Sequence, residues 1–170
     1  MRKMQIGVLA CVLAVSAVAA QQEEKQPQQQ ESSADMLMQF TRSANVDGIM
    51  MNFVYLNDRT VDALFQPPGK YALRAQARIS TLLYVQGTPD REGKLDTTFY
   101  LEQDGETTEG LTRNIKNFES GAVTKGERIN GVLQFDRKVD LTRQFTIKNS
   151  KTSLKFKLSQ EALKLMAQQE

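Results

Sequence analysis

Residues 126–159 contain short segments in which apolar and polar side chains alternate with a period of two. Successive side chains of a β-strand point to opposite faces of a sheet, so this spacing predicts strands with one buried face. The apolar positions are Ile129, Gly131, Leu133, Phe135, Phe145, Ile147, Leu154, Phe156 and Leu158. Residues 149–152 divide the last five, and we expect a hairpin turn there. The last third of the chain is therefore predicted to fold as antiparallel sheet.

Strands are also predicted between Asp47-Gly48 and Asn57-Asp58 and on either side of Asp104-Gly105. An apolar run lies between Asp47-Gly48 and Asn57-Asp58, which is typical of a strand buried on both faces, and also of a buried helical turn. Asp104-Gly105 predicts a two-residue hairpin turn, because both residues tolerate a positive φ.

The segment 71–85 has two interpretations. Its odd positions from 73 to 79 are apolar, and the turn signal Pro67-Pro68-Gly69 precedes it, which favours a strand. The alternative is a helix whose single apolar face would carry Tyr71, Ala75, Ile79 and Leu82.

Six to eight short strands predict an all-β fold, with a short C-terminal helix beginning after Ser159 as its cap. The favoured architecture is a single immunoglobulin-like β-sandwich over residues 36–170. The side chains expected in its core are Phe99, Leu133, Phe135, Phe145, Ile147 and Phe156.

The last third of the chain also resembles a known domain type. Its pattern of Gly126, Gly131, Phe135 and Phe145 is similar to the last strands of telokin-like, immunoglobulin-type domains of secreted bacterial proteins. The resemblance implies a sandwich of the same kind. It implies no activity, because one fold hosts many functions.

The N-terminus predicts export. Arg2 and Lys3 precede an apolar run and then small residues, so residues 1–20 are interpreted as a signal peptide cleaved after Ala19 or Ala20. An uncleaved membrane anchor and a lipid on Cys11 are the disfavoured alternatives. Residues 21–35 are rich in glutamine and predict a disordered tether. We expect a secreted protein, in the bacterial periplasm, with no transmembrane segment after cleavage.

Cleavage would balance the charge of the chain. The full sequence has 22 basic and 20 acidic residues, and the signal peptide contains two of the basic ones. A mature chain with no net charge argues against nucleic acid as a partner. The single cysteine, Cys11, would leave with the signal peptide, so no disulfide is expected.

The composition disfavours most catalytic chemistry. The chain has no histidine, and no serine has a lysine three residues later, so histidine-based and serine-lysine hydrolases are excluded. Glu127 stands where a phosphate-binding loop needs lysine, and Val54 where a calcium loop needs glutamate. Methionine pairs near the domain start are expected to pack, not to bind copper. We therefore predict no enzyme activity, no cofactor and no metal.

Carboxylates are the remaining candidates for catalysis. They cluster along residues 90–109 as Asp90, Glu92, Asp96, Glu102, Asp104, Glu106 and Glu109. A hydrolase would need two of them facing one cleft. A solvated acidic hairpin is the preferred interpretation.

Lysines provide the one positive indication of function. Residues 111–170 hold 12 basic and 6 acidic side chains, and the alternation directs four lysines to the solvent side: Lys148, Lys151, Lys155 and Lys157. We interpret them as a partner-binding face for an acidic envelope protein or an anionic envelope component; the alternative is protection of an edge strand. The predicted function is thus non-catalytic binding or a structural role. A carrier of a small apolar, lipid-type ligand is the second hypothesis, and a carboxylate-based hydrolase is the third.

Overall fold

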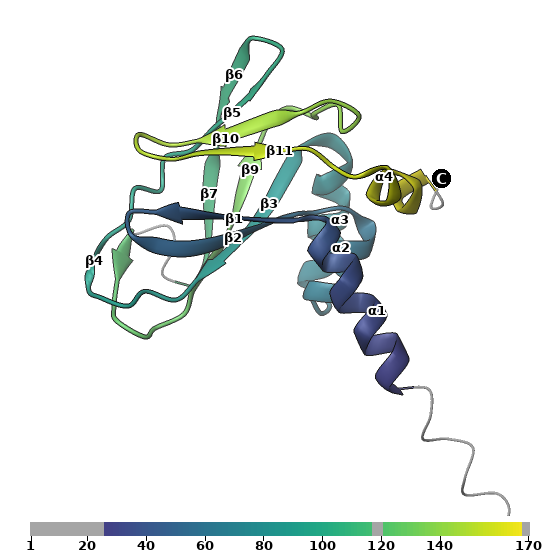
Figure 1. The fold of residues 1–170 in the computed structure, drawn as a ribbon, viewed down its shortest axis with the longest axis horizontal. Helices are drawn as coiled ribbons and strands as arrows, with labels where there is room; N and C mark the ends of the chain where they lie inside the picture. The colour runs from purple at the N-terminus through teal and green to yellow at the C-terminus, as the bar shows by residue number, and fades with distance from the viewer. Residues whose placement is uncertain (1–25, 117–120, 168–170) are drawn as a thin grey trace, which may run out of the picture.

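The computed structural model describes residues 26–116 and 121–167, in which two antiparallel sheets form the body of the molecule (Figure 1). The larger sheet has the order β1-β2-β3-β9-β7. Its strands are β1 (Thr41–Val46), β2 (Ile49–Tyr55), β3 (Thr81–Gly87), β9 (Ile129–Phe135) and β7 (Leu111–Lys116). The smaller sheet has the order β11-β10-β5-β6. Its strands are β11 (Ser153–Phe156), β10 (Phe145–Lys148), β5 (Tyr100–Gln103) and β6 (Glu106–Glu109).

The remaining elements are short. β4 (Gly93–Lys94) pairs with β8 (Ala122–Val123) in a two-stranded ribbon. The helices are α1 (Gln26–Gln39), α2 (Asp58–Leu64), α3 (Gly69–Ile79) and α4 (Gln160–Ala167). Strands outnumber helices, and α4 follows the last strand, so the all-β class and the C-terminal helix are confirmed at this level. The Ser159 hydroxyl accepts a hydrogen bond from the Ala162 N–H at 3.1 Å, as its predicted cap role requires.

The larger sheet is covered on both faces. Odd-numbered β2 residues face the smaller sheet, where the Phe53 ring meets Phe99 edge-on at 5.8 Å. Tyr84 of β3 points to the opposite face and meets Phe65, which follows α2, at 5.3 Å. Burial on both faces explains why β3 is apolar along most of its length, with five successive buried residues.

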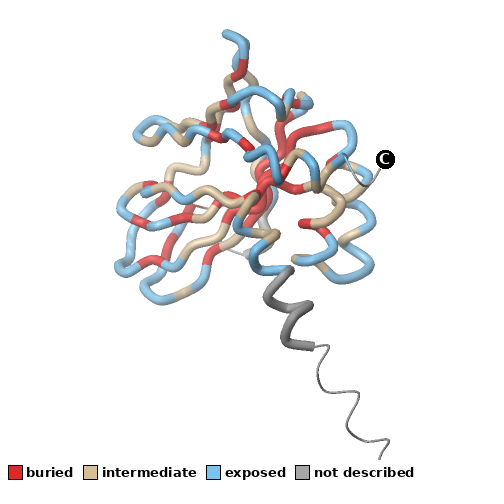
Figure 2. The backbone as a smooth tube through the Cα atoms, turned by 45° about the vertical axis from the view of Figure 1, so that its right-hand side comes forward, coloured by how far each residue is buried: buried red, intermediate tan, exposed pale blue. Residues whose placement is uncertain are grey.

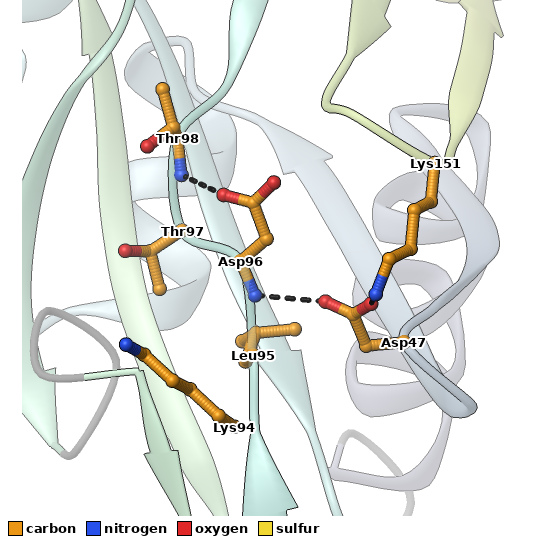
Figure 3. A pocket seen from close by; sticks show the side chains of 7 residues that line it. All are labelled: Asp47, Lys94, Leu95, Asp96, Thr97, Thr98 and Lys151. Atoms are coloured by element: carbon orange, nitrogen blue, oxygen red, sulfur yellow. Dashed lines mark hydrogen bonds and ion pairs between the residues drawn. The ribbon is translucent and has the colours of Figure 1, made fainter.

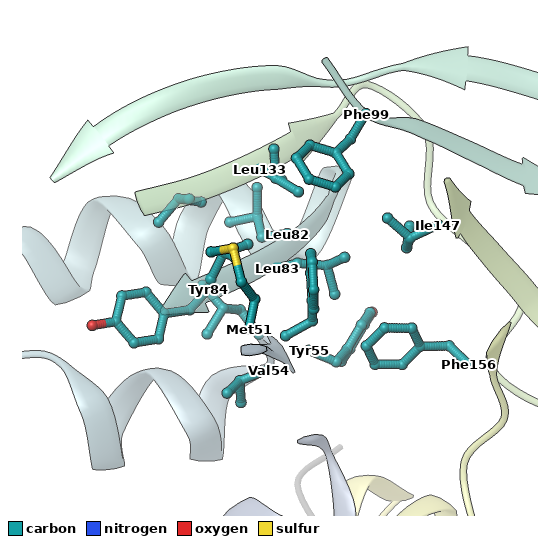
Figure 4. Close-up of a cluster of buried hydrophobic side chains, with 14 of the residues drawn as sticks. Met51, Val54, Tyr55, Leu82, Leu83, Tyr84, Phe99, Leu133, Ile147 and Phe156 are labelled. Atoms are coloured by element: carbon teal, nitrogen blue, oxygen red, sulfur yellow. The ribbon is translucent and has the colours of Figure 1, made fainter. Parts of the chain in front are cut away.

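Aromatic side chains fill the space between the two sheets (Figure 4). Phe145 stacks on Phe156 with ring centroids 5.0 Å apart, and Tyr55 reaches across from β2 to within 6.4 Å of Phe145. Figure 2 shows the buried residues concentrated in the interior, with exposed segments around them. All six side chains predicted for the core are buried, which confirms that part of the sequence analysis.

The strand predicted over residues 71–85 is wrong in its first half, because Gly69–Ile79 is helix α3 and β3 begins at Thr81. The side chains that face the sheet include Leu73, Gln76 and Ala77, at the three- and four-residue spacing of a helix. Ion pairs to α2 hold the helix further, as in the 3.1 Å contact of Lys70 Nζ with Asp62. The alternative helix is correct for Gly69–Ile79, and Tyr71, Ala75 and Ile79 do lie on one side of it, but that side is exposed and Leu82 belongs to β3.

Of the tether predicted over residues 21–35, residues 26–35 are helical in the structure, and residues 21–25 lie outside the described residues. Helix α1 begins at Gln26, so the predicted domain start at Met36 falls inside a helix. Glutamine and glutamate are good helix formers, and Met36 and Leu37 pack against the core at the end of α1. The predicted signal peptide, residues 1–20, lies outside the described residues. No helix in the described part of the chain is long and apolar enough to cross a membrane.

Candidate functional site

The structure divides the four predicted lysines into two groups. Lys155 of β11 lies opposite Thr146 of β10, and both point away from the buried Phe145 and Phe156. Lys157 directly follows β11, and it is exposed on the same side as Lys155, because the residues that alternate with them, Phe156 and Leu158, are buried. Lys151 instead lies in the turn between β10 and β11, and its side chain extends toward the β1–β2 turn. The four lysines therefore do not form one face.

Two of the four lysines are neutralised by carboxylates. Lys148 Nζ lies 2.5 Å from Glu102 of the neighbouring strand β5, and Lys151 Nζ lies 2.6 Å from Asp47. A partner would have to compete with these ion pairs. Lys148 and Lys151 are therefore weaker candidates for binding than the sequence suggested.

Arg42 of β1 contacts the backbone of Lys157, two residues after Lys155, at the seam where β1 of one sheet meets β11 of the other. Its guanidinium donates hydrogen bonds to the carbonyl oxygens of Thr41 at 2.6 Å, of Gln39 at 3.3 Å and of Lys157 at 2.5 Å. All three acceptors are neutral, so none of these contacts offsets the positive charge of Arg42. We call Arg42, Lys155 and Lys157 the seam cluster. Among the described residues, no carboxylate forms an ion pair with any of its members.

Sequence reasoning missed Arg42 because it is 115 residues away from Lys157. The β1–β11 contact that unites them crosses between two sheets. No local pattern encodes such a contact.

A second polar feature lies where three loops meet (Figure 3). It is an open hollow of about 600 Å³, which we call the loop-end hollow. It is lined by Asp47, Lys94, Leu95, Asp96, Thr97, Thr98 and Lys151. Asp47 comes from the β1–β2 turn, residues 94–98 connect β4 to β5, and Lys151 comes from the β10–β11 turn.

Both carboxylates of the hollow are held by donors. The Asp96 N–H donates to Asp47 at 2.8 Å, and Lys151 approaches the other oxygen of Asp47. These contacts, the N–H first, hold the pKa of Asp47 below its usual value. The Ser150 hydroxyl at 2.6 Å and the Thr98 N–H at 3.0 Å likewise lower the pKa of Asp96. Asp47 in turn raises the pKa of Lys151.

This electrostatic arrangement does not fit a hydrolase. Glycoside hydrolysis needs one carboxyl group with a raised pKa to donate a proton. Asp47 and Asp96 both have lowered pKa values, so both are ionised at neutral pH. We interpret their contacts as a clamp that joins the three loops.

The other acidic residues predicted near this region are dispersed. Glu102 pairs with Lys148, Asp104 pairs with Arg143, and Glu106 lies 3.0 Å from Arg137. Within the described residues, no group of three or more carboxylates or thiols is arranged to hold a metal ion.

No family model matches the chain, and neither the curated proteins nor the solved structures include a significant match. The interpretation of function therefore depends on the residues and contacts of this chain.

Proposed function

We propose that the protein is a secreted, non-catalytic binding domain of the bacterial periplasm, and that the seam cluster binds an anionic partner from the cell envelope. We also propose an immunoglobulin-like sandwich, a proposal supported by the face-to-face packing of two antiparallel sheets. The observation that carries the binding proposal is the set of three cations without a carboxylate partner among the described residues. Other cations nearby, Lys148 and Lys151, are neutralised.

The charge balance makes the seam cluster more significant. A mature chain with equal numbers of acidic and basic residues attracts anions only through local excess charge. Arg42 is also immobilised by three backbone carbonyls, so it loses little side-chain entropy when a ligand arrives. The seam cluster therefore combines free charge with partial preorganisation.

The packing offers less support for the alternative functions. Buried aromatic rings occupy the inter-sheet space in which a carrier would hold its apolar ligand. The clamped aspartates of the loop-end hollow lack a proton donor for hydrolysis. Edge protection remains the competing explanation for the lysines, because β11 is the edge strand of the smaller sheet.

Charge reversal at the seam cluster tests the proposal. The double variant Lys155→Glu/Lys157→Glu should remain folded, because exposed substitutions change stability by less than about 0.5 kcal/mol. Its crosslinking to anionic envelope material should fall about tenfold or more, since each cation near an anionic surface contributes about 1 kcal/mol. The wild-type interaction should weaken as salt is added.

The control is Lys94→Glu/Lys125→Glu, which makes the same charge change at two exposed lysines elsewhere. It should capture envelope material like the wild-type protein. Undiminished, salt-insensitive capture by the folded seam variant would reject the binding proposal and leave edge protection as the role of those lysines.

A further inference from the structure

Helix α3 has a second apolar face that its own fold does not use. Leu73 and Ala77 face the sheet, whereas Tyr71, Ala75 and Ile79 lie on the outer side. Tyr71 is 60% exposed and Ile79 is 70% exposed. We call Tyr71, Ala75 and Ile79 the α3 strip. Large apolar side chains that gather on one exposed face are characteristic of interaction sites.

A groove runs beside the α3 strip, between the helix and the sheet. Its volume is about 130 Å³, and the buried side chains of Leu82 and Val132 form its floor. It is lined by Ala72, Leu73, Gln76, Leu82, Arg113, Val132 and Gln134, and we call it the α3 groove. Leu111 of β7 lies opposite Gln134 in the β7–β9 register and is 53% exposed. Apolar surface thus extends from α3 across the groove to β7.

The spacing of the α3 strip favours a helix as its partner. Residues four apart form the ridges that interdigitate when two helices pack. Ala75 leaves a notch between the larger Tyr71 and Ile79, in which a partner side chain can insert.

Charge specifies the partner further. Helix α3 contains three basic residues and no acidic one, and within the described part of the chain these three cations pair with two carboxylates of α2, Asp58 and Asp62, so one positive charge remains. Arg78, next to the α3 strip, remains 71% exposed. Across the groove, the described partner of Arg113 is the neutral Gln134, at 2.9 Å. Cations therefore border the apolar surface on both sides. A second α3 would bring like charges together, which disfavours a dimer through this face.

We propose that the α3 strip and the α3 groove bind an amphipathic helix of a partner protein that carries acidic side chains along both flanks of its apolar face. This is the helix-in-groove mode of recognition. Helix α3 has 11 residues. At about 1.5 Å per residue it provides a contact about 16 Å long, or roughly three turns of the partner helix. The proposal concerns a different surface from the seam cluster and does not depend on it.

Two synthetic peptides test the proposal against the full chain. Both carry leucine at four- and three-residue spacing over about 18 residues, enough to form a helix in water; one has glutamate on its flanks and the other has lysine. In fluorescence anisotropy, the glutamate peptide should bind and the lysine peptide should not. Ile79→Glu should weaken binding about tenfold or more. Arg78→Glu should shift the preference toward the lysine peptide.

Met50→Glu is the matched control, because Met50 is 62% exposed on β2 and lies outside the strip and groove. It should bind the glutamate peptide like the wild-type chain. Absence of binding by the glutamate peptide, equal binding of both peptides, or an equal loss in Met50→Glu would overturn the proposal.

A photoreactive amino acid in place of Tyr71 identifies the natural occupant. Mass spectrometry of the crosslinked peptide should reveal an amphipathic helical sequence with acidic flanks. Crosslinks to a lipid, to an extended segment or to a second copy of this chain would instead reject the proposed helix.

Discussion

Gly110, between β6 and β7, lies directly against a core side chain. A Cβ atom there would lie 2.7 Å from Phe135 Cε1, and the Phe135 ring is fully buried. The Gly110 N–H also donates to the Phe99 carbonyl at 2.8 Å, which prevents the backbone from moving away. We predict that Gly110→Ala lowers the free energy of unfolding by about 1 to 3 kcal/mol, the usual cost of overpacking. Urea denaturation measures this difference.

Gly69 provides the control for the same substitution. Nothing lies within 4 Å of a Cβ at Gly69, which begins helix α3. Gly69→Ala should leave stability unchanged or raise it by up to about 1 kcal/mol, because alanine restricts the unfolded chain. Equal stability of the two variants would show that Phe135 does not pack as the structure indicates.

At the residue scale, the sequence predicts contacts between residues that are close along the chain and misses those between distant residues. Burial of Phe135 and Phe145 followed from alternation within one strand, and the structure confirms it. The tight space at Gly110 depends on a crossing between two sheets, and so does the position of Arg42 beside Lys157. Local periodicity contains no information about such long-range contacts.

At the scale of elements, turn chemistry was informative where strands flank it. Asp104-Gly105 forms the predicted hairpin, with φ values of 59° and 83°. Asp47-Gly48 makes the same kind of turn, with φ values of 53° and 88°, but sequence analysis treated it only as the boundary of an apolar run. The preceding strand, Thr41–Val46, is too polar to show clear alternation. Only its pairing with β2 identifies it.

The error at α3 has a different cause. Small alanines at positions 75 and 77 satisfy a period of two as well as a helical period. The deciding contacts are with the sheet, against which Leu73 and Ala77 pack, and the ion pairs with Asp58 and Asp62 of α2 add to them. Tertiary ion pairs and sheet contacts thus select the helix from two locally acceptable structures.

The loop clamp leads to a prediction about pH. The pKa of Asp47 is lowered in the folded protein. Its carboxylate therefore stabilises the fold at pH values above the usual pKa of aspartate, and this contribution disappears as the pH falls through the folded-state pKa. Asp47→Asn should therefore reduce stability by about 1 kcal/mol at neutral pH. The difference from wild type should vanish in acid. Asparagine tolerates the positive φ of this position, so the backbone turn is preserved.

Thermal unfolding from neutral to acidic pH measures this difference. Asp104→Asn is the control, since Asp104 occupies the equivalent position of the other hairpin and its one ion pair among the described residues is with the exposed Arg143. Such surface pairs contribute little, so its effect should be smaller. An Asp47→Asn deficit that persisted unchanged in acid would contradict the clamp.

At the scale of the whole molecule, two of three layers were foreseeable. The alternation of apolar and polar residues in the predicted strands placed the apolar side chains between two sheets, where Figure 4 shows them. The α2–α3 layer was not foreseen, although the apolar even-numbered positions of β3 require a cover on that face. The consequence is functional: the alternative helix grouped Tyr71, Ala75 and Ile79 on one face, but only the position of the sheet shows that this face is exposed.

The last prediction concerns export and the net charge of the whole molecule. If residues 1–20 are a signal peptide, cleavage removes Arg2, Lys3 and Cys11 and leaves 20 basic and 20 acidic residues. The isoelectric point should then fall from the value of about 8.7 calculated for the full chain toward neutrality. Intact mass spectrometry should find a chain that begins at Gln21, or at Ala20, without a reactive thiol. Replacing the small residue Ala20 with Glu should impair cleavage there.

Anion binding should survive this neutralisation, because Arg42, Lys155 and Lys157 all lie outside the predicted signal peptide. A mature chain that lost its salt-sensitive capture of envelope material would show that the basic N-terminus, and not the seam cluster, attracts the partner. An exported protein that retained Met1, or carried a lipid on Cys11, would contradict the cleavage. It would also hold the domain at the membrane, so that the seam cluster would meet anionic headgroups by proximity alone.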